Sequence, residues 1–298
     1  MIYVKKGDHE EPYSRWKITE SMTTAGFDRS KAYKLAVDLQ GRFKSDGIDE
    51  IDEDKLRDIV FSELEEIDPT IAENYAIWRR LRHEKIPLVI LIGGTSGIGK
   101  SSVALELAHR LGIKQVIGTD TIREIMKNMI APNLMPEIHY SSYEAWKSIS
   151  YKVKEDKVIV GFREQARAVA AGINAVIERS LKEGISLVIE GVHIVPEFIT
   201  VNPNIVTFLL YLSSTETHKS RFFSRSQETH IRRDATQYIN SIETIGKIQS
   251  YLDESAQESE TTSIENKEFN ETLSTMMNVT TSRMKDLLNE PDPKPLKV

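Results

Sequence analysis

The sequence contains no cysteine, and this absence excludes several kinds of site at once. Without a thiol there is no disulfide, no thiolate nucleophile and no cysteine-ligated metal. Long apolar runs are also missing, because the longest, Leu88–Ile92, is far shorter than the ~20 residues that a membrane-spanning helix needs. The N-terminus shows no apolar run typical of a signal peptide. We therefore expect a cytoplasmic protein that has no membrane partner.

The chain also lacks an excess of basic charge. Its 298 residues include 45 acidic and 39 basic side chains, which gives a formal net charge of -6. A nucleic-acid-binding protein usually presents a basic field to the phosphate backbone. The composition therefore gives no reason to expect nucleic acid as a partner. The length fits one large domain, or one large and one smaller domain.

Residues 1–85 carry the hydrophobic spacing of helices. Apolar residues recur every three to four positions in three stripes, within residues 32–43, 56–67 and 71–81. Asp68 followed by Pro69 is typical of a helix N-cap with proline in the first helical position. A short strand is expected at Ile2–Val4. The segment is predicted to be a small, mainly helical domain.

From residue 86 to residue 288 the pattern changes to alternating strands and helices. Strands are expected at 88–92, 115–117, 186–190 and 205–212. Helices are expected at about 100–111, 121–130, 157–183 with Gly184 as the cap, from 215, at 236–252 and at 270–288. A loop is expected at 131–142, an acidic solvated surface or loose connection at 253–272 and a flexible tail at 289–298. Such alternation predicts an α/β fold with a parallel sheet.

A phosphate-binding loop is predicted between the first of these strands and the helix after it. The stretch Gly94-Thr95-Ser96-Gly97-Ile98-Gly99-Lys100-Ser101 matches G-x-x-x-x-G-K-[ST] and is followed by Ser102. Glycines let backbone N–H groups turn toward a phosphate, and the helix N-terminus adds a positive field. Lys100 is expected to reach the β- and γ-phosphates, and the Ser101 hydroxyl to ligate Mg²⁺. The sequence thus predicts a parallel-sheet P-loop kinase domain that uses ATP and Mg²⁺.

Asp120 and Arg123 follow the second expected strand and are candidates for the acceptor side. A carboxylate at the end of a parallel strand is placed to orient an attacking hydroxyl and to accept its proton. Arg123, one turn later on the same face, is placed to clamp a carboxylate or phosphate of the acceptor. The alternative is that Asp120 only caps a helix starting at Thr121.

Glu190 and His193 lie at the end of the third expected strand. An acid that ends a buried apolar strand is costly unless it has a cationic partner, so Glu190 is expected to hold Mg²⁺ through water. The alternative for Glu190 is a salt bridge with a lysine or arginine. His193 is a candidate for contacting the acceptor, and the alternative is a structural histidine whose ring is paired within the protein.

Residues 218–233 form a basic segment within an acidic chain. One acid, Glu228, stands against five basic residues, which are Lys219, Arg221, Arg225, Arg232 and Arg233. Such a segment is suited to folding over phosphates as a lid, with Arg221 and Arg225 as candidates for stabilising the transferred group. The alternative is a solvated helix face.

These motifs resemble those of archaeal 2-phosphoglycerate kinases. The resemblance rests on residues 93–102, 118–124, 189–193 and 221–225, and it extends over most of 86–288. It implies that ATP phosphorylates 2-phosphoglycerate, a small phosphorylated acid, to 2,3-bisphosphoglycerate, which in methanogens leads toward cyclic 2,3-diphosphoglycerate. The Asp120 and Arg123 pair is also similar to the acceptor-binding pair of adenylylsulfate kinases. A P-loop kinase of another phosphorylated or carboxylated metabolite therefore stays open.

Residues 1–85 resemble an ATP-cone, a module that senses nucleotides in other enzymes. The resemblance rests on residues 4–8, 11–13, 17–18 and 25–27. It implies a regulatory nucleotide site, and the alternative is a domain kept for packing or homo-oligomerisation. For the whole chain, a further alternative is an ATP-sensing regulator that does not turn ATP over.

Overall fold

The computed structural model describes the backbone of residues 1–228 and 240–289, and the side chains of 1–221 and 240–289. The chain divides into two compact units. Unit 1 comprises residues 1–86 and 110–112 together with the chain from Met277 on, and unit 2 comprises residues 87–109 and 113–276. The expected boundary at residue 288 therefore differs from the boundary of unit 2, because the last helix contributes to both units. The expected tail lies outside the described residues except for Asn289.

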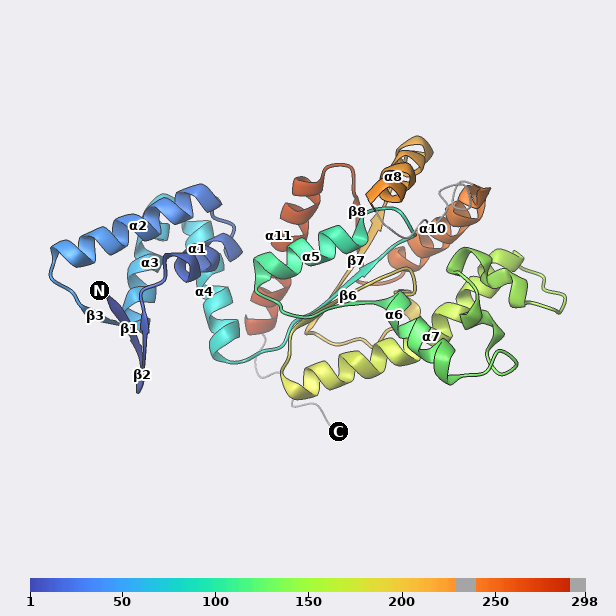
Figure 1. Cartoon of the computed structure of the whole chain (residues 1–298), viewed down its shortest axis with the longest axis horizontal. Helices are drawn as coiled ribbons and strands as arrows, with labels where there is room; N and C mark the ends of the chain where they lie inside the picture. The colour runs from blue at the N-terminus through green and yellow to red at the C-terminus, as the bar shows by residue number, and fades with distance from the viewer. Residues whose placement is uncertain (229–239, 290–298) are drawn as a thin grey trace. The chain divides into compact units, whose positions relative to one another are not determined.

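Within residues 1–86, unit 1 combines four helices with a small sheet (Figure 1). The helices are α1 (Arg15–Thr24), α2 (Arg29–Ser45), α3 (Glu53–Ile67) and α4 (Pro69–His83). The strands are β1 (Tyr3–Lys6), β2 (His9–Pro12) and β3 (Glu50–Asp52), and β1 pairs antiparallel with β2 and parallel with β3. The mainly helical character predicted for this part is confirmed.

The expected cap and apolar stripes explain the helices of unit 1. The Asp68 carboxylate accepts a hydrogen bond from the backbone N–H of Thr70 at 2.8 Å, so α4 begins where the sequence predicts. The three apolar stripes lie in α2, α3 and α4, and most of their residues are buried in the core of the unit. The strands β2 and β3 were not predicted. They are three to four residues long and mostly polar, so no local hydrophobic pattern reveals them.

Unit 2 is built on a parallel sheet of five strands. In spatial order the strands are β5 (Val116–Gly118), β6 (Leu187–Glu190), β4 (Val89–Gly93), β7 (Ile205–Tyr211) and β8 (Thr262–Glu265). All neighbouring pairs are parallel. The predicted α/β fold class is therefore confirmed. Because parallel strands run the same way, their carboxyl ends meet at one edge of the sheet.

Helices cover both faces of this sheet, with α5 and α7 on opposite sides in Figure 1. The helices are α5 (Lys100–Leu111), α6 (Thr119–Met129), α7 (Lys157–Glu183), α8 (Thr215–Glu228), α10 (Ile242–Gln257) and α11 (Phe269–Asn289), with the 3-10 turns η1 (Pro136–His139), η2 (Ser142–Ser148) and η3 (Pro196–Phe198). Apolar side chains of β4 and β6 pack against α7, which ends at Gly184 with φ 67° as predicted. The alternate residues of β4 are also fully buried, as two covered faces require.

Of the two alternatives for residues 253–272, the loose connection is wrong, whereas most of the acidic residues there are exposed, as a solvated surface requires. This stretch contains the end of α10, the strand β8 and the start of α11. Strand β8 pairs with β7, and Phe208 lies opposite Thr262. The strand was missed because its short β-branched run lies among acidic residues, which are uncommon in strands. Its partner strand lies about 50 residues earlier, so the local sequence does not show the pairing.

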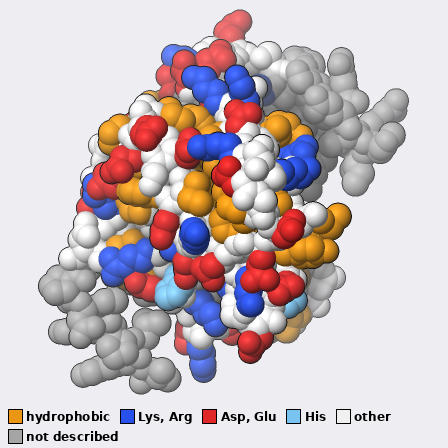
Figure 2. Space-filling model, turned by 90° about the vertical axis from the view of Figure 1, so that its left-hand side faces the viewer, with side chains coloured by type: hydrophobic (Ala, Val, Ile, Leu, Met, Phe, Trp, Pro, Cys, Tyr) orange, Lys and Arg blue, Asp and Glu red, His pale blue; other side chains and the backbone are white. Residues whose placement is uncertain are grey.

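The described part of the chain also bears on the expected partners. None of its helices is both long and apolar enough to cross a membrane. On the face drawn in Figure 2, basic and acidic side chains are interspersed, with hydrophobic ones between them.

Candidate active site

The P-loop leaves the carboxyl end of β4, and glycines set its shape. Gly94, Gly97 and Gly99 have φ of 133°, 82° and 90°, in the region that side chains other than hydrogen disfavour. A Cβ built at Gly94 would lie 2.3 Å from the carbonyl oxygen of Leu210. The close approach of β7 therefore excludes any larger residue at this position.

Lys100 begins α5 and folds back over the loop. Its Nζ donates to the carbonyl oxygen of Thr95 at 2.7 Å, and the residue is only 8% exposed. A buried ammonium is costly unless it is paired. The geometry holds this charge against the loop, where the sequence pattern predicts the phosphates.

Ser101 and Glu190 meet at the edge of the sheet, as the metal-site prediction requires. The Ser101 Oγ donates to Glu190 Oε1 at 2.8 Å. Within the described residues Glu190 forms no ion pair, so the geometry does not support the salt-bridge alternative. Hydroxyl and carboxylate oxygens are the ligand types that Mg²⁺ prefers, and Mg²⁺ usually keeps several waters and phosphate oxygens besides. These two residues therefore fit a magnesium ion.

Asp120 lies in the first turn of α6, close to this edge. The helix begins at Thr119 with Gly118 at the N-cap, so the alternative that Asp120 caps a helix starting at Thr121 is wrong. Desolvation by its surroundings favours the neutral acid, but His193 in its protonated form, together with the positive charges of Arg123 and Lys100, holds the pKa of Asp120 below its usual value. The lowered pKa keeps the carboxylate ionised at neutral pH. The side chain is 64% exposed and is therefore accessible.

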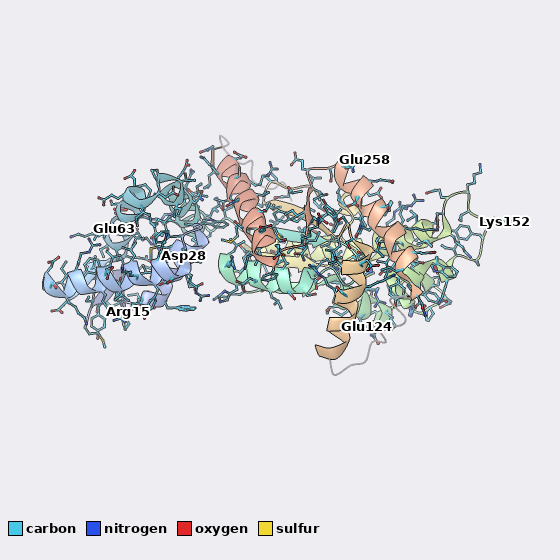
Figure 3. The ribbon with its side chains drawn as sticks, turned by 90° about the horizontal axis from the view of Figure 1, so that it is seen from above. Arg15, Asp28, Glu63, Glu124, Lys152 and Glu258 are labelled. Carbon is cyan, nitrogen blue, oxygen red and sulfur yellow. The ribbon has the colours of Figure 1, made fainter. Side chains whose placement is uncertain are left out.

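Arg123 is an anchor for the chain that follows α6. Its Nη1 donates to the carbonyl oxygens of Ile138 at 2.9 Å and Tyr140 at 3.2 Å, while Nε lies 3.5 Å from Asp120 Oδ1. Its Nη2 lies 3.7 Å from the carboxylate of Glu124, which is labelled in Figure 3. The Arg123 side chain is 13% exposed. Arg123 thus ties η1 and its C-terminal neighbour to α6, which the sequence did not predict.

His193 is fully buried, and both of its ring nitrogens are used within the protein. Nδ1 lies 2.9 Å from Thr119 Oγ1, and Nε2 lies 3.1 Å from Gln165 Oε1. The Gln165 amide nitrogen donates to the carbonyl oxygens of Glu137 and Tyr140, so its Oε1 accepts and His193 Nε2 carries the proton. His193 therefore has no free ring nitrogen with which to contact the acceptor. The alternative of a structural histidine paired within the protein fits.

Burial keeps the His193 imidazole neutral. Burial is the largest influence and lowers the pKa of His193 to about 4, although Asp120 opposes that shift. The adjacent turn is equally tight, because a Cβ at Gly191, with φ 152°, would lie 1.8 Å from Thr119 Oγ1. The result is a rigid connection from β6 through His193 to Gln165 and η1.

Arg221 contacts the outer side of the P-loop. Its Nη1 donates to the carbonyl oxygen of Ile98 at 2.9 Å, and its Nη2 to that of Asn266 at 2.6 Å. His218, one turn earlier, has Nε2 at 2.6 Å from the carbonyl oxygen of Ser96. The start of the basic segment is therefore attached to the loop in this structure. The side chain of Arg225 lies outside the described residues, as do Arg232 and Arg233, so the lid itself remains a prediction.

The residues that sequence reasoning missed are Thr119, Gln165 and Asn266. Gln165 is fully buried and interrupts the apolar face of α7, and this polar break was a usable signal. Asn266 directly follows β8, within the segment expected to be loose. Its role depends on strand pairing that the local sequence does not show.

The solved structures similar to this chain include small-metabolite kinases. A gluconokinase from Sinorhizobium meliloti is 15% identical, with TM-score 0.42, over 68% of this chain and 96% of its own. A shikimate kinase from Acinetobacter baumannii in complex with shikimate is 16% identical, with TM-score 0.37, over 72% and 99%.

Sequence comparison reaches further. The family model of the ATP cone domain matches residues 1–84. A 2-phosphoglycerate kinase from Methanopyrus kandleri is 42% identical over 95% of this chain and 88% of its own length. Proteins of the same name from Pyrococcus furiosus, 41% identical over 93% and 91%, and Methanothermobacter thermautotrophicus, 42% identical over 87% and 86%, agree with it. With an ATP cone in front of a P-loop kinase fold and relatives that match nearly end to end, this chain belongs to the 2-phosphoglycerate kinase family.

Proposed function

We propose that the protein transfers the γ-phosphoryl group of Mg-ATP to the free hydroxyl of 2-phosphoglycerate, which gives ADP and 2,3-bisphosphoglycerate. The observation that carries the proposal is the meeting of three groups at one sheet edge. Lys100 lies against the P-loop, Ser101 pairs with Glu190, and Asp120 lies in the first turn of the neighbouring helix. Membership of the family supports the choice of acceptor.

In this reaction the acceptor oxygen forms a bond to the γ-phosphorus, and the bond from that phosphorus to the β,γ-bridging oxygen breaks. The leaving pair of electrons stays on ADP. Asp120 accepts a hydrogen bond from the attacking hydroxyl and takes its proton. Since its pKa is lowered, the carboxylate is ionised at neutral pH and mainly orients the nucleophile.

Lys100 and the loop amides would neutralise the charge on the β- and γ-phosphates. Ser101 and Glu190 would hold Mg²⁺, Glu190 through water, and the ion supplies further charge neutralisation when it is bound. Arg123 acts in this proposal by holding residues 138–140 beside Asp120. Direct contact of Arg123 with the acceptor is a second proposed role, for which Nη2 remains available apart from the distant Glu124 carboxylate.

The proposal is tested by ADP release with a panel of acceptors. The panel contains 2-phosphoglycerate, 3-phosphoglycerate, glycerate and adenylylsulfate, each with Mg²⁺ and with excess chelator. We expect rapid, Mg²⁺-dependent ADP release with 2-phosphoglycerate and the bisphosphate as product. Faster turnover with another acceptor would identify a different small-metabolite kinase. ATP binding without stimulation by any acceptor would favour the ATP-sensing regulator.

The match to the ATP cone domain favours a second, regulatory nucleotide site within residues 1–84. We propose that this site binds ATP independently of the P-loop. Calorimetry with Mg-ATP on Lys100→Ala tests the idea, because this change affects unit 2 only. We expect Lys100→Ala still to bind one ATP per chain. Complete loss of ATP binding would mean that unit 1 holds no nucleotide and serves packing or homo-oligomerisation.

A further inference from the structure

Three side chains donate hydrogen bonds to the outer side of the P-loop. The carbonyl oxygen of Ile98 accepts from Asn266 Nδ2 at 2.7 Å and from Arg221 Nη1 at 2.9 Å. The carbonyl oxygen of Ser96 lies 2.6 Å from His218 Nε2. These carbonyls belong to the loop whose glycine conformations turn N–H groups toward a phosphate. The carbonyl oxygens of Ser96 and Ile98 are therefore bound by side chains of the protein.

The donors come from two separate connections of the sheet. His218 and Arg221 lie on α8, which follows β7, and Asn266 directly follows β8. Asn266 and His218 are almost fully buried, at 3% and 6% exposure. The contacts that Asn266 and His218 make with the loop are therefore shielded from solvent.

The orientation of the Asn266 amide is determined by its surroundings. Its Oδ1 accepts from Thr272 Oγ1 at 3.0 Å, so Nδ2 is the end that faces the loop. Its own carbonyl accepts from Arg221 Nη2 at 2.6 Å. The fit is close, because a Cβ at Gly99 would lie 2.9 Å from Asn266 Nδ2. Asn266 is thus the centre of the contact.

Each of these carbonyls shares a peptide group with the N–H of the following glycine. Ser96 is joined in this way to Gly97, and Ile98 to Gly99. A donor on the carbonyl polarises the peptide group and makes its N–H a stronger donor, by roughly 10–30% per bond in condensed-phase estimates. The contacts on the outer side therefore strengthen the phosphate-facing donors on the inner side.

We infer that Asn266, Arg221 and His218 are positioning residues, which preshape the P-loop and polarise the Gly97 and Gly99 amides for the nucleotide phosphates. The inference rests on the proposed binding of nucleotide at the loop. It assigns to Arg221 a role on the loop backbone, where the sequence suggested contact with the transferred group. It also gives the β8 connection a part in phosphate binding without touching the phosphate.

The first test is the amide spectrum of the full-length protein in the absence of nucleotide. The chain has 15 glycines, so selective labelling of glycine with ¹⁵N gives a sparse, assignable spectrum. In Asn266→Ala the Gly99 amide proton should move upfield, because its peptide group loses a donor, while Gly112 at the end of α5 should not move. An unmoved Gly99 resonance would overturn the inference, whether or not the protein binds nucleotide.

The second test is Mg-ADP affinity by calorimetry. We expect Asn266→Ala to weaken binding about tenfold, the effect of losing one hydrogen bond that matters to binding. Asn204→Ala is the matched control, because Asn204 Nδ2 donates to the carbonyl of Pro87 at 2.8 Å, at the opposite end of β4. Asn204→Ala should lower thermal stability and leave the affinity unchanged. Equal affinities of the two variants would overturn the inference.

A charge control completes the design. Arg221→Lys keeps the positive charge on α8 but lacks the two Nη groups that reach the carbonyls of Ile98 and Asn266. Like Arg221→Ala, it should shift Gly99 and weaken Mg-ADP binding by more than severalfold. Unchanged affinity of Arg221→Lys beside weakened binding by Arg221→Ala would assign the effect to the general field of α8 and overturn the positioning role. Failure of the proposed nucleotide site would appear differently, as an absence of Mg-ADP binding by the unmodified protein.

Discussion

The P-loop and the acceptor-side segment of residues 136–140 are stabilised in the same way but originate differently. In both, one buried side chain and one half-buried arginine donate to backbone carbonyls, Asn266 and Arg221 at the loop and Gln165 and Arg123 at the segment. The loop also has its own glycine conformations, whereas the segment has only a short 3-10 turn. A loop with local conformational preferences is recognisable in the sequence, and a segment held from outside is not.

The nucleotide side should respond most strongly to the loss of Lys100. We expect Lys100→Ala to reduce kcat by about 10²–10³-fold, the cost of removing one preorganised group that stabilises transition-state charge. ADP release with saturating acceptor measures the effect. Lys114→Ala, an exposed lysine shortly after α5, is the control and should retain activity. Activity of Lys100→Ala within a few-fold of the unmodified protein would contradict the P-loop assignment.

On the acceptor side, the burial of His193 should make the stability of the folded protein depend on pH. The pKa of His193 is about 4 in the folded protein against 6.5 as its ordinary value, so the unfolded chain binds the proton more readily. The contribution of His193 to the free energy of unfolding is therefore complete above pH 6.5. As the pH falls to 4, the free energy of unfolding decreases by up to about 3 kcal/mol. Denaturant unfolding of the protein and of His193→Gln across this range measures the difference. Equal pH dependence of the two would contradict a buried neutral imidazole.

Removing Arg123 should separate the acceptor from the nucleotide. Arg123→Ala leaves the carbonyls of Ile138 and Tyr140 without this donor, so the acceptor KM should rise far more than the ATP KM. The loss is about 2–3 kcal/mol, typical of charge-assisted hydrogen bonds. Steady-state kinetics with each substrate varied in turn measure the two constants, and Arg123→Lys is the conservative control. Equal changes in both constants would place Arg123 outside the acceptor side.

The smallest effect is expected at Thr95, inside the P-loop. Its Oγ1 is buried and, in the described part of the structure, has no hydrogen-bond partner. Thr95→Val replaces this hydroxyl by a methyl group of similar shape and should stabilise the free protein by about 1 kcal/mol. Thermal unfolding without nucleotide measures the change, with Thr95→Ser, which keeps the hydroxyl, for comparison. Destabilisation by Thr95→Val would show that the hydroxyl has a partner.

The sequence by itself determined the features that depend on neighbours in the chain. The P-loop follows from its glycines, the cap at Asp68 from a local hydrogen bond, and α7 with its end at Gly184 from hydrophobic spacing. These are short-range effects, because the interacting groups lie within a few residues of one another.

Only the tertiary structure decided which distant groups meet. It brought three sets of distant groups within hydrogen-bond distance: Glu190 and Ser101, His193 with Thr119 and Gln165, and Asn266 with the carbonyl of Ile98. The last contact joins residues 168 positions apart, and it depends on the pairing of β8 with β7. Such contacts arise from strand order and burial, in which hydrogen-bond donors and acceptors removed from water must find partners wherever the fold brings them.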